Sequence, residues 1–251
     1  MAPQVIHPQD DAGRVFEVLK KGGIAIIPAS VGYGVVAIDT GALQRIFVAK
    51  KRQPHKRHAM IGSYALHQAL HVLPAREAGM VRLLAVDLDL PLGVVAPCRL
   101  DHPIMQKLPP ETLARSSVEG TLAMLVNGGA FQDELSRLAM EEELPLMGSS
   151  ANLTGRGTKT LVEDIEPEIR DVADIIVDYG KAKFNHPRPS STMFDFKNIQ
   201  LLRYGACYDV VQDALWRFYG LNMPNDPGRA ILFSGHLENE QNRYYAQVGR
   251  P

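Results

Sequence analysis

Apolar positions along this chain recur with two different spacings, and segments of the two kinds alternate. Apolar residues three or four positions apart predict helices with one buried face, whereas short continuous apolar runs between turn residues predict buried strands. The helical spacing is found in segments 10–23, 40–52, 63–73, 133–142 and 206–220. The predicted strands are segments 24–27, 35–39, 58–62, 121–126, 144–148, 173–180, 191–196 and 199–205.

This alternation predicts an α/β fold, a single twisted mixed sheet flanked by helices. Segment 28–34 is expected to be a glycine-punctuated loop, with Pro28 ending the strand before it. Segment 75–120 mixes both periods, and no clear pattern follows residue 220. The simplest division is one domain over residues 1–206 and a C-terminal extension over 207–251. Val210, Val211, Leu215 and Phe218 of the last helix are expected to pack on the sheet.

Composition narrows the class of protein without identifying its chemistry. The 251 residues are 45% hydrophobic and 22% charged with a net charge of -1, as in a globular protein with no general attraction to nucleic acid or membrane. Cys98 and Cys207 lie far apart without a CxxC pattern, so we expect free thiols and no zinc site. No secretory leader or membrane-spanning run is visible, and a cytoplasmic location is expected.

The stretch MGSSANLTGRGT, residues 147–158, changes from apolar to small and polar where a strand is predicted to end. Ligands of open α/β sheets bind at that edge, and successive backbone N–H groups there form an anion nest. The Ser150 hydroxyl is able to donate to a phosphate oxygen, and the Asn152 amide to donate and accept. The alternative interpretation is an ordinary turn with a helix cap.

A basic cluster follows the second predicted helix and contains Lys50, Lys51, Arg52, His55, Lys56, Arg57 and His58. Lysine and arginine two positions apart are suited to clamping a polyphosphate, and the same charges are suited to RNA phosphates. The cluster is equally consistent with cations that complement the dipole of a helix end.

Three further segments carry polar side chains beside predicted strands. Gly32 and Gly34 allow the backbone to approach a ligand closely, while Tyr33 either closes a pocket or packs in the core. Ser191 opens the segment STMFD, and Arg203 lies in LLRYG. Taken singly, each of these residues favours a structural role.

Their order along the chain is more specific than any one of them. The series runs P-x-x-x-x-Y-G from Pro28, K-x-R from Lys50, SSANLTG from residue 149, STMFD, and LLRYG. From Gly13 to Ala206 this series resembles the Sua5/YciO/YrdC family. The resemblance implies a twisted α/β sheet with a concave, positively charged face. It also implies synthesis of threonylcarbamoyl-AMP and pyrophosphate from ATP, bicarbonate and L-threonine, and an association with RNA.

The resemblance also implies roles for individual residues. Lys50 and Arg52 would hold phosphates in catalysis, and Ser150, Asn152, Ser191 and Arg203 would bind the nucleotide. Ser30, Val31 and Tyr33 would face the amino acid. ATP would be a substrate, Mg²⁺ would bridge its phosphates, and partner proteins would carry the product to adenosine 37 of tRNA.

Three positions depart from the family pattern and fall on the amino-acid side. Val31 stands where the family has a threonine, PLGVVAPC replaces P-G-P-x-T, and Leu125-Val126-Asn127 replaces R-V-P. A divergent nucleotide- or RNA-binding protein with another substrate, or with no synthase activity, is therefore the alternative, and a purely structural RNA-binding module is a third. The extension 207–251 is expected to form a partial lid or a dimer contact.

Overall fold

The computed structural model of the chain describes residues 6–51 and 58–237. Its helices are α1 Pro8–Lys20, α2 Thr40–Ala49, α3 Tyr64–Leu70, α4 Ala75–Arg82, α5 Pro103–Gln106, α6 Pro110–Ala114, α7 Ala130–Glu141, α8 Pro167–Arg170 and α9 Tyr208–Tyr219. Its strands are β1 Ala25–Ala29, β2 Gly32–Ala37, β3 Ala59–Ile61, β4 Leu92–Pro97, β5 Ser117–Val118, β6 Thr121–Val126, β7 Met147–Ser150, β8 Ile175–Ile176, β9 Thr192–Asp195 and β10 Gln200–Arg203. No helix in these ranges is long and apolar enough to cross a membrane.

The described strands form one mixed sheet in the order β10-β9-β4-β6-β3-β7-β2-β1-β8, with β5 beside β6. The pairs β3–β6, β4–β9 and β1–β8 are parallel, and the remaining pairs are antiparallel. This arrangement confirms the predicted α/β class. The hydrogen bond from Ser30 N to Gly128 O at 2.7 Å shows that the end of β1 meets the loop after β6, although three strands separate them. The twist of the sheet brings these two segments together.

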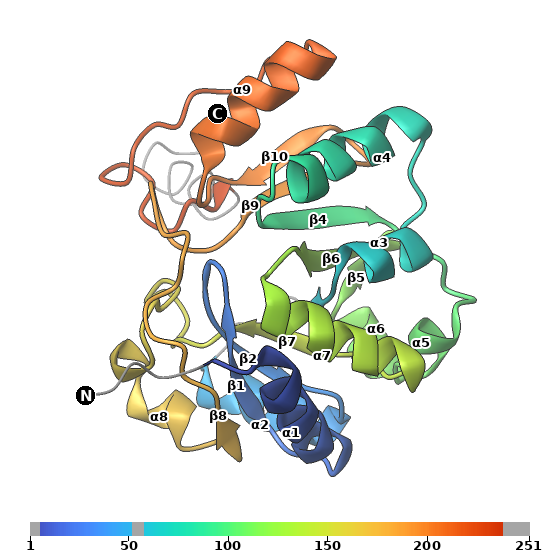
Figure 1. Cartoon of the computed structure of the whole chain (residues 1–251), viewed down its shortest axis with the longest axis vertical. Helices are drawn as coiled ribbons and strands as arrows, with labels where there is room; N and C mark the ends of the chain where they lie inside the picture. Colours follow the sequence, from blue (N-terminus) through green and yellow to red (C-terminus); the bar gives the residue numbers. More distant parts are fainter. Residues whose placement is uncertain (1–5, 52–57, 238–251) are drawn as a thin grey trace, which may run out of the picture.

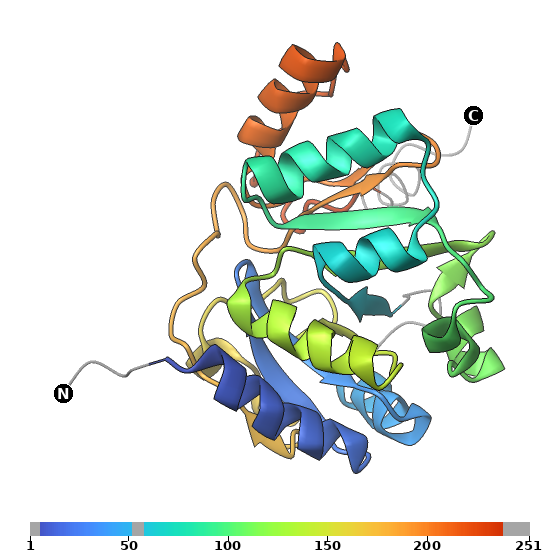
Figure 2. The same cartoon turned by 45° about the vertical axis from the view of Figure 1, so that its right-hand side comes forward.

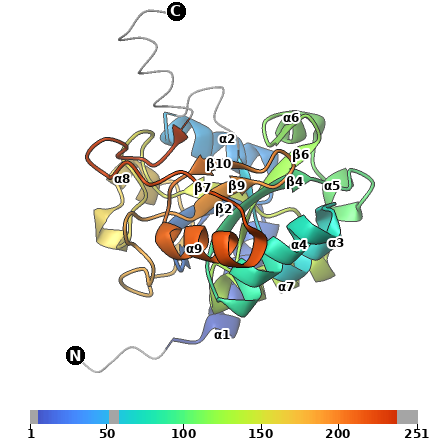
Figure 3. The same cartoon turned by 90° about the horizontal axis from the view of Figure 1, so that it is seen from above.

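Helices cover both faces of the sheet. Figures 1 and 2 show α1, α7, α3 and α4 in a row on one side, and Figure 3 shows α2 on the opposite side from α1 and α7. Side chains of β1 alternate accordingly, because Ala25 and Ile27 join the core under α1 and α7 while Ile26 joins the larger core. Local caps fix two helix starts, since Asp39 accepts from Ala42 N at 3.0 Å and Ser63 accepts from Leu66 N at 3.2 Å.

The expected loop over 28–34 is wrong, because most of it is a β-hairpin. Ala29 pairs with Gly32, so only Ser30 and Val31 form the turn, and Pro28 lies inside β1 opposite Tyr33. The backbone N–H and C=O of Tyr33 bond away from β1, to Lys159 O and Ala151 N. This is therefore a non-hydrogen-bonded pair, in which the missing N–H of proline breaks no bond between the two strands.

The mixed segment 75–120 contains both element types in succession. Helix α4 continues into a π-helical stretch over Leu83–Asp87, and β4, α5, α6 and β5 follow. The last helix differs from expectation in part. Val211 and Leu215 are buried, but Val210 and Phe218 are 43% and 66% exposed. Val210 lies off the buried stripe, and Phe218 lies in the last turn of α9, which projects from the body (Figure 2).

After α9 the chain returns to the sheet as an irregular segment, residues 221–237, called here the C-terminal segment. Arg188 and Asp226 form a two-bond ion pair at 2.9 Å, and Tyr204 N donates to Gly235 O at 3.0 Å. These contacts hold the segment along the outer edge of β10. The division at residue 206 stays a prediction, as do the roles suggested for the extension.

Candidate functional site

Two distant chain segments meet the β1–β2 hairpin near its turn. Val31 O accepts from Ser190 N at 2.9 Å, which joins the hairpin turn to the segment before β9. Ala151 N donates to Tyr33 O at 2.8 Å, and Tyr33 N donates to Lys159 O at 2.9 Å. These bonds join the hairpin to the turn after β7. The predicted nucleotide residues on β7 and before β9 are therefore both tied to one hairpin.

Lys50 lies at the C-terminal end of α2 and is buried. Its ammonium donates to Asn152 O at 2.6 Å and also to Ser150 O. The Lys50 carbonyl in turn accepts from Thr154 N at 3.1 Å and Thr154 Oγ1 at 2.8 Å. Lys50 thus holds the turn after β7 through both its ammonium group and its carbonyl. Its role in holding a phosphate remains a prediction. Arg52 lies outside the described residues.

Ser150 and Asn152 are presented at the end of β7, as the sequence predicted for a strand end. The Ser150 hydroxyl is half-buried and makes no hydrogen bond to any described residue. Asn152 is 6% exposed, and its Nδ2 donates to Leu153 O at 2.6 Å while its Oδ1 has no partner among the described residues. Ser149 Oγ is also buried without a hydrogen-bond partner among the described residues, and the sequence pattern did not single it out. Buried polar atoms normally have partners, so these atoms point to a missing hydrogen-bonding group.

Ser191 and Arg203 form a second polar unit beside β4. Arg203 Nε donates to Ser191 O at 2.9 Å, and Nη2 donates to Ser191 Oγ at 3.0 Å. Burial lowers the pKa of Arg203 to about 10, so the guanidinium is charged at neutral pH. Within the described ranges no carboxylate lies within ion-pair distance of Arg203. A positive charge removed from water without a counterion is costly, and it suits an anionic ligand.

His236 extends this unit from a part of the sequence that showed no pattern. Arg203 Nη1 lies 3.4 Å from His236 Nε2, and Arg203 and His236 form an isolated antiparallel bridge. Phe233 of the same segment lies against Gly157, where an added Cβ would be 3.4 Å from the ring. The C-terminal segment therefore contacts both the Arg203 unit and the turn after β7. Sequence periodicity has no way to find these residues because they lie in irregular backbone.

The residues expected to face an amino acid are not brought to one place. Ser30 Oγ lies 3.4 Å from Asn127 O, and Val31 is buried. The Tyr33 hydroxyl lies 2.9 Å from Asp178 Oδ1 and 2.7 Å from Gly180 O, and accepts from Tyr179 N. Burial first, and then the Asp178 carboxylate, raise the pKa of Tyr33. Tyr33 therefore packs in the core in this structure, the second of the two roles considered for it.

Gly32 lies directly after the hairpin turn, at a position where a side chain would not fit. Its φ of 137° is unfavourable for side chains, and an added Cβ would lie 2.4 Å from Thr158 Cγ2 and 2.8 Å from Lys159 O. Residues 158 and 159 follow the SSANLTG stretch, so this glycine allows the hairpin and the turn after β7 to touch. No group of three or more His, Cys, Asp or Glu residues suited to a metal occurs in the described ranges.

Comparison with known proteins identifies the family of this fold. The model of the Sua5/YciO/YrdC family, described as telomere recombination, matches residues 17–205. No curated protein matches the chain. A hypothetical protein of Streptococcus mutans UA159 is 21% identical with a TM-score of 0.67, over 82% of this chain and 91% of that one.

Two further solved structures share the fold. Sua5 of P. abyssi, complexed with L-threonine, is 21% identical with a TM-score of 0.61, over 80% of this chain and 55% of that one. YciO of E. coli is 18% identical with a TM-score of 0.56, over 77% and 85% of the two chains. This chain thus spans about half the length of the P. abyssi protein. With a family match that covers most of its length, the chain belongs to the Sua5/YciO/YrdC family.

Proposed function

We propose that this chain binds ATP and transfers its adenylyl group to the carbamate of an amino acid, with L-threonine as the first candidate. The observation that carries the proposal is the charged Arg203 guanidinium, which bonds to Ser191 and has no carboxylate counterion within the described ranges. A nucleotide phosphate would supply the missing negative charge. The Ser150 hydroxyl could donate to a phosphate oxygen, and Asn152 Oδ1, which has no partner among the described residues, could accept from an N–H or O–H of the same nucleotide.

This reaction depends on how the protein positions the reactants, and it requires no covalent intermediate with the protein. An amino group and bicarbonate form a carbamate with loss of water, and a carbamate oxygen then attacks the α-phosphorus of ATP while pyrophosphate leaves. Fixed positive charge and hydrogen-bond donors lower the barrier of such a displacement when they are already oriented. Arg203 is held by two bonds to Ser191, and the turn after β7 is held by Lys50, so both sides are preorganised.

A magnesium ion would enter with the triphosphate, whose oxygens are its usual ligands. Within the described ranges no protein carboxylate cluster suits such an ion, so we derive no step through it. The further steps expected of a synthase, transfer to adenosine 37 of tRNA with partner proteins in the cytoplasm, belong to the same proposal. They rest on the family membership alone.

L-Threonine is proposed because a structural relative, Sua5 of P. abyssi, has been solved with that amino acid. A specific observation also favours a second candidate function, nucleotide or RNA binding with another substrate or without synthase activity. Val31 is buried and has no side-chain hydrogen-bonding group, and the Tyr33 hydroxyl is occupied by residues 178–180. Binding of a polar amino acid is strongly disfavoured where the protein no longer offers hydrogen-bonding groups to it.

The deciding experiment is pyrophosphate release from ATP and bicarbonate by the purified protein, with and without L-threonine. Release that requires threonine would support the synthase. Binding of ATP without threonine-dependent turnover would contradict it and favour the second candidate, and a screen of other amino acids would follow. The double variant S150A/N152A should weaken ATP binding by about 2 kcal/mol, since both groups would bond to a charged ligand. Unchanged ATP affinity would remove these residues from the site.

A further inference from the structure

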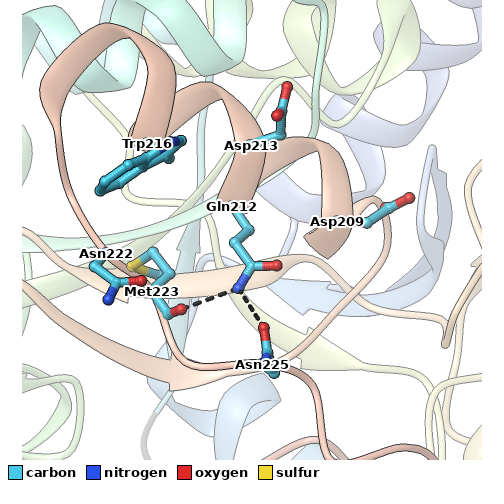
Figure 4. A pocket seen from close by; sticks show the side chains of 7 residues that line it. All are labelled: Asp209, Gln212, Asp213, Trp216, Asn222, Met223 and Asn225. Carbon is cyan, nitrogen blue, oxygen red and sulfur yellow. Dashed lines mark hydrogen bonds between the residues drawn. The ribbon is translucent and has the colours of Figure 1, made fainter.

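A separate cavity of about 360 Å³ lies between α9 and the C-terminal segment (Figure 4). None of the residues at the candidate site lines it. Its lining residues come from one helix and from the loop that follows it. They are Asp209, Gln212, Asp213, Trp216, Asn222, Met223 and Asn225.

The helical side of this cavity is a single face of α9. Asp209, Gln212, Asp213 and Trp216 follow each other at positions i, i+3, i+4 and i+7, so they lie along one side of the helix. The loop side is fixed to this face, because Gln212 Nε2 donates to Met223 O at 2.9 Å and lies 3.2 Å from Asn225 Oδ1. Met223 is buried and forms the base. The cavity is therefore built into the folded chain.

The lining combines negative charge with one exposed aromatic surface. It contains two carboxylates and no lysine, arginine or histidine. Asp209 forms no ion pair with a described residue, and the pair of Asp213 with Arg217 at 2.8 Å joins side chains that are 57% and 69% exposed. Pairs of this exposed kind contribute little and are easily exchanged. Trp216 is 59% exposed, so its indole is open to a ligand.

We infer that this cavity binds a guanidinium group. A guanidinium is planar, stacks on an indole, and offers several N–H donors to carboxylate and amide oxygens. An anion would be repelled by Asp209, which has no ion pair with a described residue, and an apolar ligand would strip water from the carboxylates without replacing its hydrogen bonds. An ammonium ion shares the charge but has fewer donors and no plane to stack. The group comes either from a free small molecule or from an arginine side chain of another polypeptide.

The single tryptophan of the chain makes the inference directly measurable, because Trp216 is the one tryptophan among the 251 residues. The full-length protein is titrated with agmatine, and separately with a tripeptide that has blocked ends and arginine at its centre. We expect a saturable change in Trp216 emission that weakens as salt is added. Putrescine, which has the same chain and double charge as agmatine but an ammonium in place of the guanidinium, should bind about fivefold more weakly. Saturation by agmatine indicates a small-molecule ligand, and saturation by the peptide alone indicates a polypeptide.

Variants separate this site from general charge attraction. D209N and D213N should each reduce the affinity for the bound probe about 5- to 10-fold by removing a charged acceptor. D101N is the matched control, since Asp101 is exposed outside the cavity, and its affinity should equal that of the unaltered protein. Absence of saturation with both probes, or equal affinities for D209N, D213N and D101N, would overturn the inference. Putrescine binding as tightly as agmatine would overturn the preference for guanidinium.

Discussion

Arg203, which is part-buried, and Arg188, which is fully buried, show how differently two arginines are treated within one fold. Arg188 is 1% exposed and forms two bonds of 2.9 Å with the Asp226 carboxylate. Arg203 bonds to the hydroxyl and carbonyl of Ser191 and has no acidic partner among the described residues. Since burial disfavours an uncompensated charge, Arg203 gains most from an anionic ligand. This contrast distinguishes a structural arginine from a candidate binding arginine.

Replacement of Arg203 tests this distinction. R203M should lower ATP affinity at least about tenfold, because a charge-assisted bond to phosphate is lost. Its free energy of unfolding should change little or rise, since a part-buried charge without a carboxylate partner among the described residues is removed. Binding is measured by isothermal titration calorimetry and stability by urea denaturation. R99M replaces an exposed arginine and serves as the control. Equal ATP affinity for R203M and R99M would contradict the role given to Arg203.

At the scale of elements, the β1–β2 hairpin organises the site. Its turn contacts Gly128 and Ser190, and its second strand contacts the turn after β7. Gly32 allows the closest of these approaches, because its φ is 137° and Thr158 occupies the space where a Cβ would lie. The hairpin turn is therefore bonded to Ser190, a residue more than 150 positions further along the chain.

Two glycine substitutions should act in opposite directions. G32A should destabilise the protein by about 1–3 kcal/mol, since it forces a strained φ and a clash with Thr158 and Lys159. G13A lies in α1 with open space around it and should stabilise by roughly 0.5–1 kcal/mol. Urea denaturation of both variants measures the difference. A stability for G32A equal to that of G13A would show that the hairpin adapts to a side chain.

Helix α3 carries a buried histidine pair that makes stability depend on pH. His67 Nδ1 lies 2.8 Å from His71 Nδ1, and His71 Nε2 lies 3.2 Å from Leu122 O. Burial lowers the pKa of His67 to about 4 and, together with the neighbouring His67, that of His71 to about 3. An unfolded histidine has a pKa near 6.5, so between about pH 6.5 and 4 the unfolded state binds more protons.

Stability should therefore fall as the pH drops from about 6.5 to 4, and it should be insensitive to this pair above 6.5. Each of the two histidines should cost about 3 kcal/mol over this range, at about 1.4 kcal/mol per pKa unit. Urea denaturation at several pH values measures the slope. H67L/H71L should flatten it, and H7Q, which alters an exposed histidine, should leave it unchanged. If H67L/H71L and H7Q showed the same slope, the loss of stability at acid pH would belong to other titrating groups.

At the scale of the whole molecule, the C-terminal segment completes the fold beyond the family match, which ends at residue 205. Met223 and Leu232 are part of the larger core, and Tyr208 OH donates to Pro224 O. Phe233 and His236 reach the turn after β7 and Arg203. Residues after the family domain thus contribute to both stability and the candidate site.

The Arg188–Asp226 pair should be the main attachment of this segment. D226N should destabilise the protein by about 3–5 kcal/mol, because Arg188 would remain buried without a counterion. Chemical denaturation followed by circular dichroism measures the loss. D101N, at an exposed aspartate, should change stability by less than about 0.5 kcal/mol. A loss equally small for D226N would mean that water replaces the carboxylate and that the segment is held elsewhere.

The sequence alone determined the features that depend on neighbours along the chain. Helical spacing predicted α1, α2, α3, α7 and α9, and apolar runs predicted most strands, because periodicity and turn residues act locally. The motif order from Pro28 to Arg203 predicted the family, which the match over residues 17–205 confirms. Ser150 and Asn152 were placed at a strand end for the same local reason.

Only the tertiary structure decided which distant residues meet and in what electrostatic setting. It placed Pro28 inside β1, turned the Tyr33 hydroxyl towards residues 178–180, and directed the Lys50 ammonium to the carbonyls after β7. It also left Arg203 without a counterion among described residues and brought His236 beside it. Strand pairing, twist and burial arise from contacts between residues far apart in sequence. Local spacing carries no information about such contacts.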